Sequence, residues 1–233
     1  MIEKTNLAGW LVAGMLACGP AHAALMDRGG GMIYDTDLNI TWLKDANYAK
    51  TSGYDIDGKM NWNTANAWAS NLVYGGYNDW RLPSTTDLGM DGCNYAYSNT
   101  DCGFNVATNS SELAHLFFVE LGNKSAYDPA GTYRGSLNSG LVNKSPFQNL
   151  QSDTNYWSEA FSFLPASYAW TFNTTLGLQY VDEQYYEFNA WAVRNGDVAA
   201  VPEPTGALLF GLSLAGLVAT RRQYLRTSRT SEF

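Results

Sequence analysis

Residues 76–83 read Gly-Tyr-Asn-Asp-Trp-Arg-Leu-Pro, and they separate two parts of the chain that differ in pattern. Proline disfavours helix at the residue before it, so Trp80-Arg81-Leu82 is expected to be short and extended. Before this stretch, apolar residues recur at helical spacing, and well after it come short runs rich in aromatic and β-branched residues. Helices followed by antiparallel strands indicate an α+β domain.

Short strands are expected at both ends of the domain. They cover residues 32–34, 40–43, 156–163, 168–172, 178–181 and 190–194. Asp and Asn between residues 35 and 39 favour a turn that joins the first two strands. The large aromatics Trp157, Trp170 and Trp191 on the later strands are more typical of a core than of a binding surface.

Three helices are expected between the two groups of strands. The first runs from about Trp62 to Leu72 and ends at Gly75-Gly76. A brief second helix begins at Ser84, with Asp87 as its capping partner. A third is capped by Asn109 and Glu112. Gly122 ends this helix. Its buried apolar stripe consists of Leu113, Leu116, Phe117 and Leu121.

The composition narrows the class of protein. Of 233 residues, 45% are hydrophobic and 14% aromatic, which excludes a disordered chain. The formal net charge is −8, although four arginines stand close together near the C-terminus. The body of the chain is therefore more acidic than the whole, and such a surface repels nucleic acids and sulfated polysaccharides.

Residues 1–23 have the pattern of a secretory signal peptide. Lys4 precedes the apolar run 7–17, which is too short to span a bilayer, and Ala21-His22-Ala23 is a small-x-small cleavage site. The mature chain is then expected to begin at Ala24. An uncleaved anchor and lipoprotein processing at Cys18 are the alternatives.

Residues 201–233 form a second terminal segment. Pro202-Glu203-Pro204 precedes an apolar run over 205–218. As a helix, residues 205–220 would be about 24 Å long at 1.5 Å per residue. Arg221 and Arg222 follow it and mark that side as cytoplasmic. A core helix is the alternative, but the run lacks a polar face.

This tail resembles the PEP-CTERM sorting signal, with its proline motif, short hydrophobic helix and terminal arginines in order. The resemblance implies a partner, an exosortase-type membrane enzyme that cleaves near the motif. It also implies export to the cell surface or the medium of a Gram-negative bacterium that makes exopolysaccharide. Residues 24–200 are then the folded domain, held at the membrane by the tail until processing.

Cys93 and Cys102 are the cysteines that remain after removal of the signal peptide. They are close in sequence, and exported compartments are oxidising, so we expect a disulfide. A metal-binding pair is the alternative, but it needs further ligands. His115 would be the one histidine of the mature chain, which disfavours a zinc site of the usual His/Cys type.

The domain resembles the Lcl C-terminal-domain family over roughly residues 31–198. The motifs that carry the resemblance are Tyr34-Asp35-Thr36-Asp37, Thr41-Trp42-Leu43, residues 76–83, Tyr156-Trp157-Ser158, Ala169-Trp170 and Trp191-Ala192-Val193-Arg194. The resemblance implies a C-type-lectin-like unit with two main helices, a twisted antiparallel sheet and neighbouring termini. The resemblance also implies adhesion and the binding of sulfated polysaccharides, to which related domains are linked, although the acidic charge of this chain disfavours a polyanion.

Asp79-Trp80-Arg81 is the candidate binding site. Aromatic faces stack on sugar rings, and Asp and Arg bind hydroxyls. The structural alternative places Trp80 in the core and pairs Arg81 with a carboxylate.

Calcium is a weaker candidate. Asp35, Asp37 and Asn39 alternate as in a calcium loop, and Asp55 and Asp57 before Gly58 form a second fragment, but ordinary turns explain both.

No catalytic residue is singled out, and no cofactor is expected. The chain lacks a cysteine after Cys102, which does not support formylglycine-generating chemistry. We therefore expect a non-enzymatic surface module that binds a neutral glycan or a surface protein. A polysaccharide hydrolase and a purely structural matrix protein are the alternatives.

Overall fold

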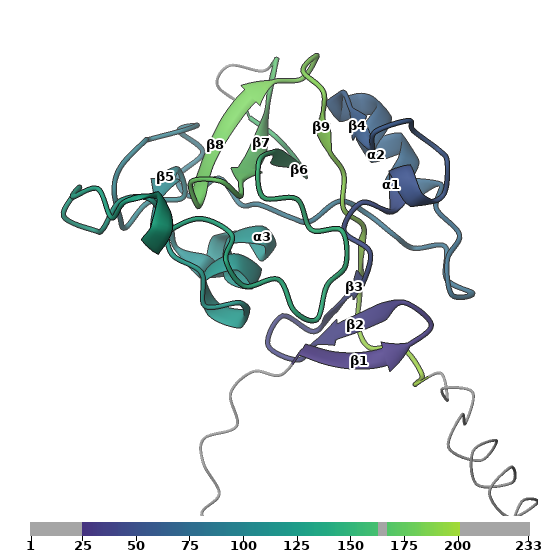
Figure 1. The fold of residues 1–233 in the computed structure, drawn as a ribbon. Coiled ribbons are helices and arrows are strands. Elements are labelled where there is room, and N and C mark those ends of the chain that lie inside the picture. Colours follow the sequence, from purple (N-terminus) through teal and green to yellow (C-terminus); the bar gives the residue numbers. More distant parts are fainter. Residues whose placement is uncertain (1–24, 163–166, 201–233) are drawn as a thin grey trace, which may run out of the picture.

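The computed structural model describes residues 25–162 and 167–200, which form two β-sheets with short helices beside them (Figure 1). The expected α+β class is confirmed, with strands predominating. The strands are β1 (Leu25–Gly29), β2 (Met32–Asp35), β3 (Ile40–Leu43), β4 (Lys59–Met60), β5 (Gly103–Phe104), β6 (Asn155–Phe161), β7 (Tyr168–Asn173), β8 (Leu178–Glu183), β9 (Phe188–Asn189) and β10 (Val193–Asn195). The helices are α1 (Tyr48–Thr51), α2 (Trp62–Ser70) and α3 (Glu112–His115), with a π-helical turn over Leu116–Glu120 and 3₁₀ turns over Thr108–Ser110 and Ser136–Asn138.

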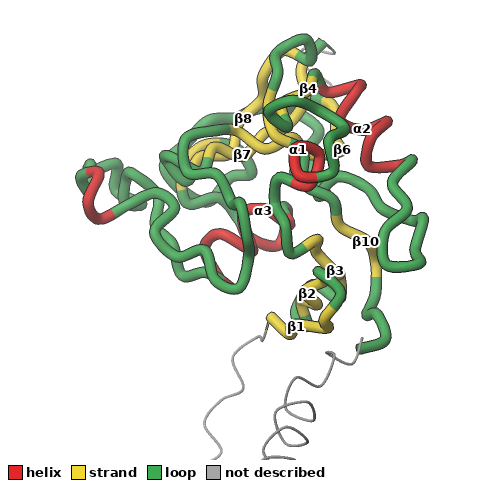
Figure 2. The backbone as a smooth tube through the Cα atoms, turned by 45° about the vertical axis from the view of Figure 1, so that its right-hand side comes forward, coloured by secondary structure: helices red, strands yellow, loops and turns green. Residues whose placement is uncertain are grey.

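The smaller sheet joins the two ends of the domain. Its order is β1-β2-β3-β10, and each neighbouring pair is antiparallel. β2 and β3 confirm the first two expected strands. Arg28 Nη2 lies 2.5 Å from Asp197 Oδ2, so β1 and the residues after β10 are held together. Figure 2 shows these strands grouped at one end of the molecule.

The larger sheet has the order β4-β9-β6-β7-β8-β5. β6, β7 and β8 correspond to expected strands and pair antiparallel, whereas β6 and β9 pair parallel, with Tyr156 opposite Asn189. The expectation of one antiparallel sheet is wrong. The strand expected over 190–194 is also wrong in its first part: residues 190–192 carry the chain from β9 in one sheet to β10 in the other.

α2 confirms the first expected helix. Asn61 Oδ1 accepts a hydrogen bond from the Thr64 backbone N–H at 3.0 Å, which satisfies one of the free donors at the helix start. Its apolar face buries Ala65, Trp68 and Ala69.

The brief helix expected at Ser84 is wrong. Glu112 Oε2 accepts the Ser84 backbone N–H at 2.7 Å, and Thr85 forms a bridge with Ser111, so distant partners hold this segment extended. The third helix forms, but Ser111 caps it in place of Asn109 and accepts the Ala114 N–H at 3.2 Å. Its expected apolar stripe is buried.

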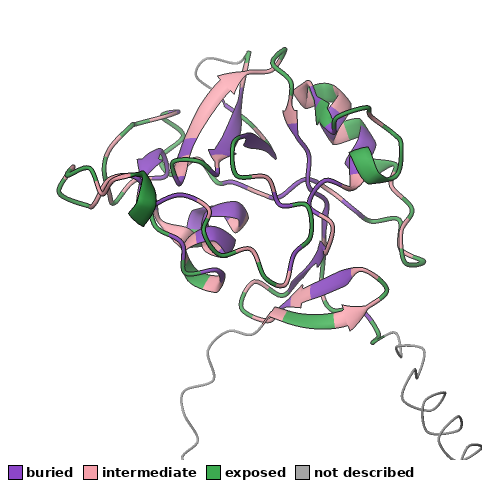
Figure 3. Cartoon of the chain, in the orientation of Figure 1, coloured by how far each residue is buried: buried purple, intermediate pink, exposed green. Residues whose placement is uncertain are grey.

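The core is rich in tryptophan, as the sequence indicates. Trp42, Trp157, Trp170 and Trp191 are at most 1% exposed. Trp42 and Trp191 belong to the two ends of the domain, and their ring centroids lie 4.8 Å apart. Figure 3 shows buried residues concentrated where β6, β7, β3 and α3 face the interior. Burial of these large aromatics supplies much of the hydrophobic stabilisation.

The expected disulfide between Cys93 and Cys102 is present, with Cα atoms 5.1 Å apart. Gly103, next to it, has a φ of +110°, and a Cβ there would lie 1.9 Å from the Ala96 carbonyl oxygen. Only glycine fits so close to another backbone, so the chain runs in tight contact beside the disulfide.

Within the described residues, no helix has both the length and the apolar character that crossing a membrane requires. The expected signal peptide, with Ala21 and Ala23 at its cleavage site, and the tail with Pro202, Glu203, Pro204, Arg221 and Arg222 lie outside the described residues.

Candidate functional site

Trp80, the centre of the expected sugar site, lies in the core. Its residue is 2% exposed, and its indole N–H donates to the Tyr74 carbonyl oxygen at 3.3 Å. The ring meets Tyr74 edge-on, with centroids 6.0 Å apart. Both faces are therefore covered by protein, which fits the structural alternative for this residue.

Arg81 makes a two-point ion pair with Glu112. Its Nη1 and Nη2 donate to the two carboxylate oxygens at 2.8 and 2.7 Å. Burial works against the charged guanidinium, but the Glu112 carboxylate outweighs it and raises the pKa of Arg81. Arg81 Nη2 also donates to Asn195 Oδ1 at 2.6 Å. This guanidinium links three segments of the fold.

Asp79 forms an ion pair with a different residue, Arg194. The carboxylate accepts from Nε at 2.8 Å and from Nη2 at 2.9 Å, and Arg194 stacks on the Tyr77 ring at 4.1 Å. The hydrogen bond from Arg194 lowers the pKa of Asp79. The side chains of Asp79, Trp80 and Arg81 thus make three separate contacts, and a sugar site formed by them stays a prediction.

A hollow of about 490 Å³ opens elsewhere, over α1, β4 and β9 and the loop before β6. We call it the amide hollow. Its lining residues are Asn47, Lys50, Thr51, Asp57, Lys59, Asn149, Gln151, Asp153 and Asn189. Figure 1 shows α1, β4 and β9 close together at the end of the molecule away from β1. The lining holds amides, a hydroxyl and both signs of charge, and no aromatic ring.

Two buried amides form the floor of the amide hollow. Asn189 is 1% exposed, and its Nδ2 donates to Asn47 Oδ1 at 3.2 Å and to the Gly58 carbonyl oxygen at 3.3 Å. Gly58 has a φ of +83°, and a Cβ there would lie 1.8 Å from Asn47 Oδ1. Asn189 Oδ1 has no hydrogen-bond partner among the described residues. This oxygen is itself buried beneath the floor, so a ligand would meet the more exposed polar groups of the lining, such as Asn149 and Gln151.

The rim of the amide hollow carries the charges. Lys50 and Lys59 are exposed, and neither ammonium forms an ion pair with a described residue. Asn149 is fixed by a hydrogen bond from its Nδ2 to Asp45 Oδ2 at 3.0 Å, and Gln151 Nε2 donates to the Asn149 carbonyl oxygen at 2.6 Å. The rim thus combines fixed amides with two free cations.

Sequence reasoning missed the amide hollow because its residues come from four separate segments. One of them contains the Asp55, Asp57 and Gly58 fragment considered for calcium. Asp55 Oδ1 accepts the backbone N–H groups of Asp57 and Gly58 at 3.0 and 2.8 Å, so it serves an ordinary aspartate turn. The turn shapes the floor of the hollow.

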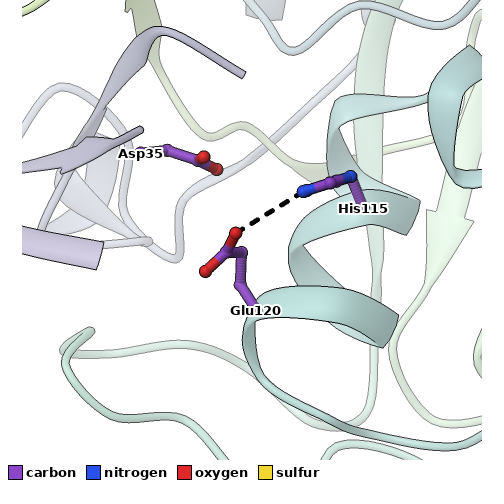
Figure 4. Close-up of side chains that lie close together, drawn as sticks. All are labelled: Asp35, His115 and Glu120. Carbon is purple, nitrogen blue, oxygen red and sulfur yellow. Dashed lines mark ion pairs between the residues drawn. The ribbon is translucent and has the colours of Figure 1, made fainter. Parts of the chain in front are cut away.

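A second group of functional side chains lies at the turn between β2 and β3. Asp35, at the start of this turn, is fully buried, and its side chain lies beside His115 and Glu120 (Figure 4). One ligand atom from each of the three residues lies within 4.8 Å of the others. His115 Nε2 is 3.5 Å from Glu120 Oε1 and 3.8 Å from Asp37 Oδ2. We call these four residues the acid–histidine cluster.

Burial dominates the electrostatics of the acid–histidine cluster. It raises the pKa of Asp35, against the opposing hydrogen bond from the Leu38 N–H. Burial also raises the pKa of Glu120, and the neighbouring Asp35 carboxylate raises it further. Asn39, the third residue of the expected calcium fragment, lies outside this cluster: its Oδ1 accepts the Tyr34 hydroxyl at 2.9 Å. The calcium assignment itself stays a prediction.

Comparisons with known proteins match two parts of the chain. The family model described as the Lcl C-terminal domain matches residues 31–194, and that described as the PEP-CTERM protein-sorting motif matches residues 200–223. No curated protein and no solved structure matches the chain. The sorting motif implies processing by an exosortase-type membrane enzyme and a place at the cell surface or outside the cell. With the motifs that run from Tyr34 to Arg194 inside the matched region, the chain belongs to the Lcl C-terminal domain family and carries a PEP-CTERM sorting signal.

Proposed function

We propose that this domain is a carbohydrate-binding module of the cell surface and that the amide hollow holds its ligand. The observation that carries the proposal is the lining of the hollow: amide groups held in place by hydrogen bonds, with two exposed ammonium groups beside them. Sugars present many hydroxyls, each both donor and acceptor, and amides complement both roles.

The fixed geometry of the hollow favours binding. Asn47 and Asn189 hold each other, and Asn149 is held by Asp45, so these amides lose little freedom when a ligand arrives. A volume of about 490 Å³ is within the range of small-molecule sites, which is roughly 300–1,000 Å³. It suits a short stretch of a polysaccharide.

Charge favours a neutral glycan as the ligand. Lys50 and Lys59 face Asp57 and Asp153 around the same hollow, so neither sign predominates there. The chain as a whole carries a net charge of −8, which opposes the approach of a polyanion. We therefore propose a neutral chain of the host's own extracellular polysaccharide as the ligand.

We also propose a C-type-lectin-like topology for the domain. A surface protein as the partner and hydrolysis of the polysaccharide are alternative proposals for its function. A purely structural matrix role is the alternative to any ligand. The experiments below separate these functions.

Calorimetry of the purified chain with fragments of the host's neutral exopolysaccharide tests the proposal. The informative variants are Lys50→Ala and Gln151→Ala, both at the amide hollow. The matched control is Lys124→Ala, because Lys124 is exposed and lines a separate hollow of about 200 Å³. A second control, Tyr133→Ala, removes a 56% exposed ring from a surface cluster of tyrosines.

We expect the hollow variants to weaken binding by roughly 3- to 30-fold, the loss that one or two hydrogen bonds produce. Both control variants should bind as the parent does. Loss of binding in Tyr133→Ala with normal binding in Lys50→Ala and Gln151→Ala would move the site to the tyrosines and contradict the proposal. Release of reducing ends during the titration would favour the hydrolase, and the absence of any binding would favour the structural role.

A further inference from the structure

We propose that the acid–histidine cluster is a binding site for one divalent transition-metal ion, with zinc as the best match. Asp35, His115 and Glu120 supply three ligands, and the exposed Asp37, whose Oδ2 lies 3.8 Å from His115 Nε2, supplies a fourth. This inference stands on the geometry of the cluster and does not depend on the proposed glycan function.

The ligand atoms already converge. One atom from each of the three residues lies within 4.8 Å of the others, and Figure 4 shows the side chains pointing toward one another from the β2 end and from the α3 region. Zinc binds carboxylate oxygen and imidazole nitrogen at about 2.0–2.2 Å, so two ligand atoms of a tetrahedral site stand about 3.4 Å apart. A pair of ligand atoms 4.8 Å apart must therefore close by about 1.4 Å, a movement that two side chains share.

Two of the converging atoms lack partners. His115 Nε2 and Glu120 Oε1 are buried and make no hydrogen bond within the described residues; at 3.5 Å they make only an ion-pair contact. The Glu120 side chain is 2% exposed and is aimed at His115 and Asp35. A buried polar atom without a partner is costly, and a bound cation would satisfy both atoms at once.

Charge points to a cation. The carboxyl groups of Asp35, Asp37 and Glu120 lie around one imidazole, and carboxylates placed so close together repel one another. A divalent ion reverses this repulsion into attraction.

The surroundings already fix the first ligand. Asp35 Oδ1 accepts the backbone N–H groups of Asp37 and Leu38, each at 3.1 Å. Asp35 Oδ2 receives the Trp42 indole N–H at 3.4 Å, a weak bond that leaves this oxygen free to bind metal. Such supporting hydrogen bonds orient metal ligands in known sites.

The π-helical turn brings the other two ligands together. In a regular α-helix, residues five apart point about 140° away from each other, because each residue turns about 100°. The π-helical turn over Leu116–Glu120 widens the helix, and the Leu121 N–H donates to the Leu116 carbonyl oxygen at 2.9 Å, five residues back. His115 and Glu120 therefore reach the same side, at a local geometry that often marks a functional site.

The ligand set selects the metal class. An imidazole with carboxylates suits zinc or a similar transition metal, whereas calcium prefers an all-oxygen shell of six to eight ligands. His115 and His22 are the two histidines of the chain, and His22 precedes the expected signal cleavage. A second histidine-based site is therefore not expected to compete.

The test is a metal titration of the purified full chain, freed of metal with chelator and carrying a tag without histidine. Zn²⁺, Mn²⁺ and Ca²⁺ are compared by calorimetry and by thermal unfolding, and bound metal is counted by elemental analysis. The informative variants are Glu120→Gln and His115→Gln. The matched control is Glu187→Gln, an exposed glutamate outside the cluster. Circular dichroism checks that each variant folds.

We expect one Zn²⁺ per chain, weaker Ca²⁺ binding, and a rise in unfolding temperature with Zn²⁺. Glu120→Gln and His115→Gln should bind Zn²⁺ at least tenfold more weakly, while Glu187→Gln binds as the parent does. Visible absorption of the Co²⁺-loaded parent reports the ligand set directly, even if a variant fails to fold.

Three results would overturn the proposal: no dication bound by the parent, unchanged affinity in both cluster variants, or a Co²⁺ spectrum of the hydrated ion. A parent that binds zinc but no glycan would leave this site intact and refute only the proposed function.

Discussion

Arg81 and Glu112 form two parallel hydrogen bonds, at 2.8 and 2.7 Å, that tie the segment before Pro83 to the first turn of α3. Their side chains are 24% and 12% exposed. Glu112 also accepts the Ser84 N–H, so its carboxylate holds the chain on both sides of Pro83. Arg81 and Glu112 thus have a structural role at this position.

The first prediction concerns this pair. Glu112→Gln should lower the free energy of unfolding by about 2–4 kcal/mol, somewhat less than for a fully buried pair, because it leaves a shielded guanidinium with a neutral partner. Urea unfolding followed by tryptophan fluorescence measures the change. Asp27→Asn, which removes the more exposed pair with Lys44, should cost less than about 1 kcal/mol. Equal losses in the two variants would show that Arg81 and Glu112 contribute no more than a surface pair.

The second prediction concerns the disulfide. Cys93 and Cys102 are nine residues apart. A disulfide that closes such a loop lowers the conformational entropy of the unfolded chain, which stabilises the folded state by about 2.5 kcal/mol. Replacing both cysteines by alanine should therefore lower the urea midpoint without loss of the fold. Mass spectrometry of secreted protein without reductant should show the two peptides linked. Free thiols at both positions would contradict the disulfide.

The third prediction concerns pH. Arg194 lowers the pKa of Asp79 below its ordinary value of 3.8, so the folded state favours the ionised carboxylate. The stability that this pair contributes is then fully present above about pH 4 and is lost as the pH falls through the lowered pKa. Asp79→Asn should cost less than about 1 kcal/mol at pH 7, because the pair is partly exposed.

The pH prediction is measured by comparing parent and Asp79→Asn in urea at pH 7 and near pH 3. The difference between them should shrink at the lower pH. A difference that grows on acidification would have the wrong sign and would exclude this pair as its source.

The fourth prediction concerns sorting. Pro202 and Pro204 belong to the matched sorting motif, and proline favours an extended backbone of the kind that processing enzymes bind in their clefts. Changing both to alanine should leave full-length protein in the membrane fraction of the host, as judged by immunoblotting. Replacing Thr227 and Ser228 by alanine, beyond the matched motif, is the control and should not alter release. Unchanged release of the proline variant would argue against recognition of the motif.

The sequence predicted the elements that local pattern determines. α2 follows from the spacing of Ala65, Trp68 and Ala69 with a capping residue before it, and β2 and β3 follow from apolar runs on either side of an aspartate turn. The disulfide follows from export and from the small separation of two cysteines. In each case the deciding residues lie within about ten positions of one another.

Elements that depend on distant partners were missed. Ser84 has the local pattern of a helix start, yet its N–H binds Glu112, twenty-eight residues on. The smaller sheet includes β10, which pairs with β3 from the other end of the domain. No local sequence pattern indicates this pairing. The acid–histidine cluster was missed for a different reason: His115 and Glu120 share a side only through the π-helical turn, and helical spacing of 3.6 residues separates them.

The contact between Arg28 and Asp197 has a consequence for how the protein stands on a cell. Since β1 and the chain after β10 leave the fold together, a tail that attaches the domain to any support does so from the same pole as its beginning. α1, β4 and β9 lie toward the opposite pole. In a molecule attached by such a tail, α1, β4 and β9, which carry part of the amide hollow, would lie on the side away from the support.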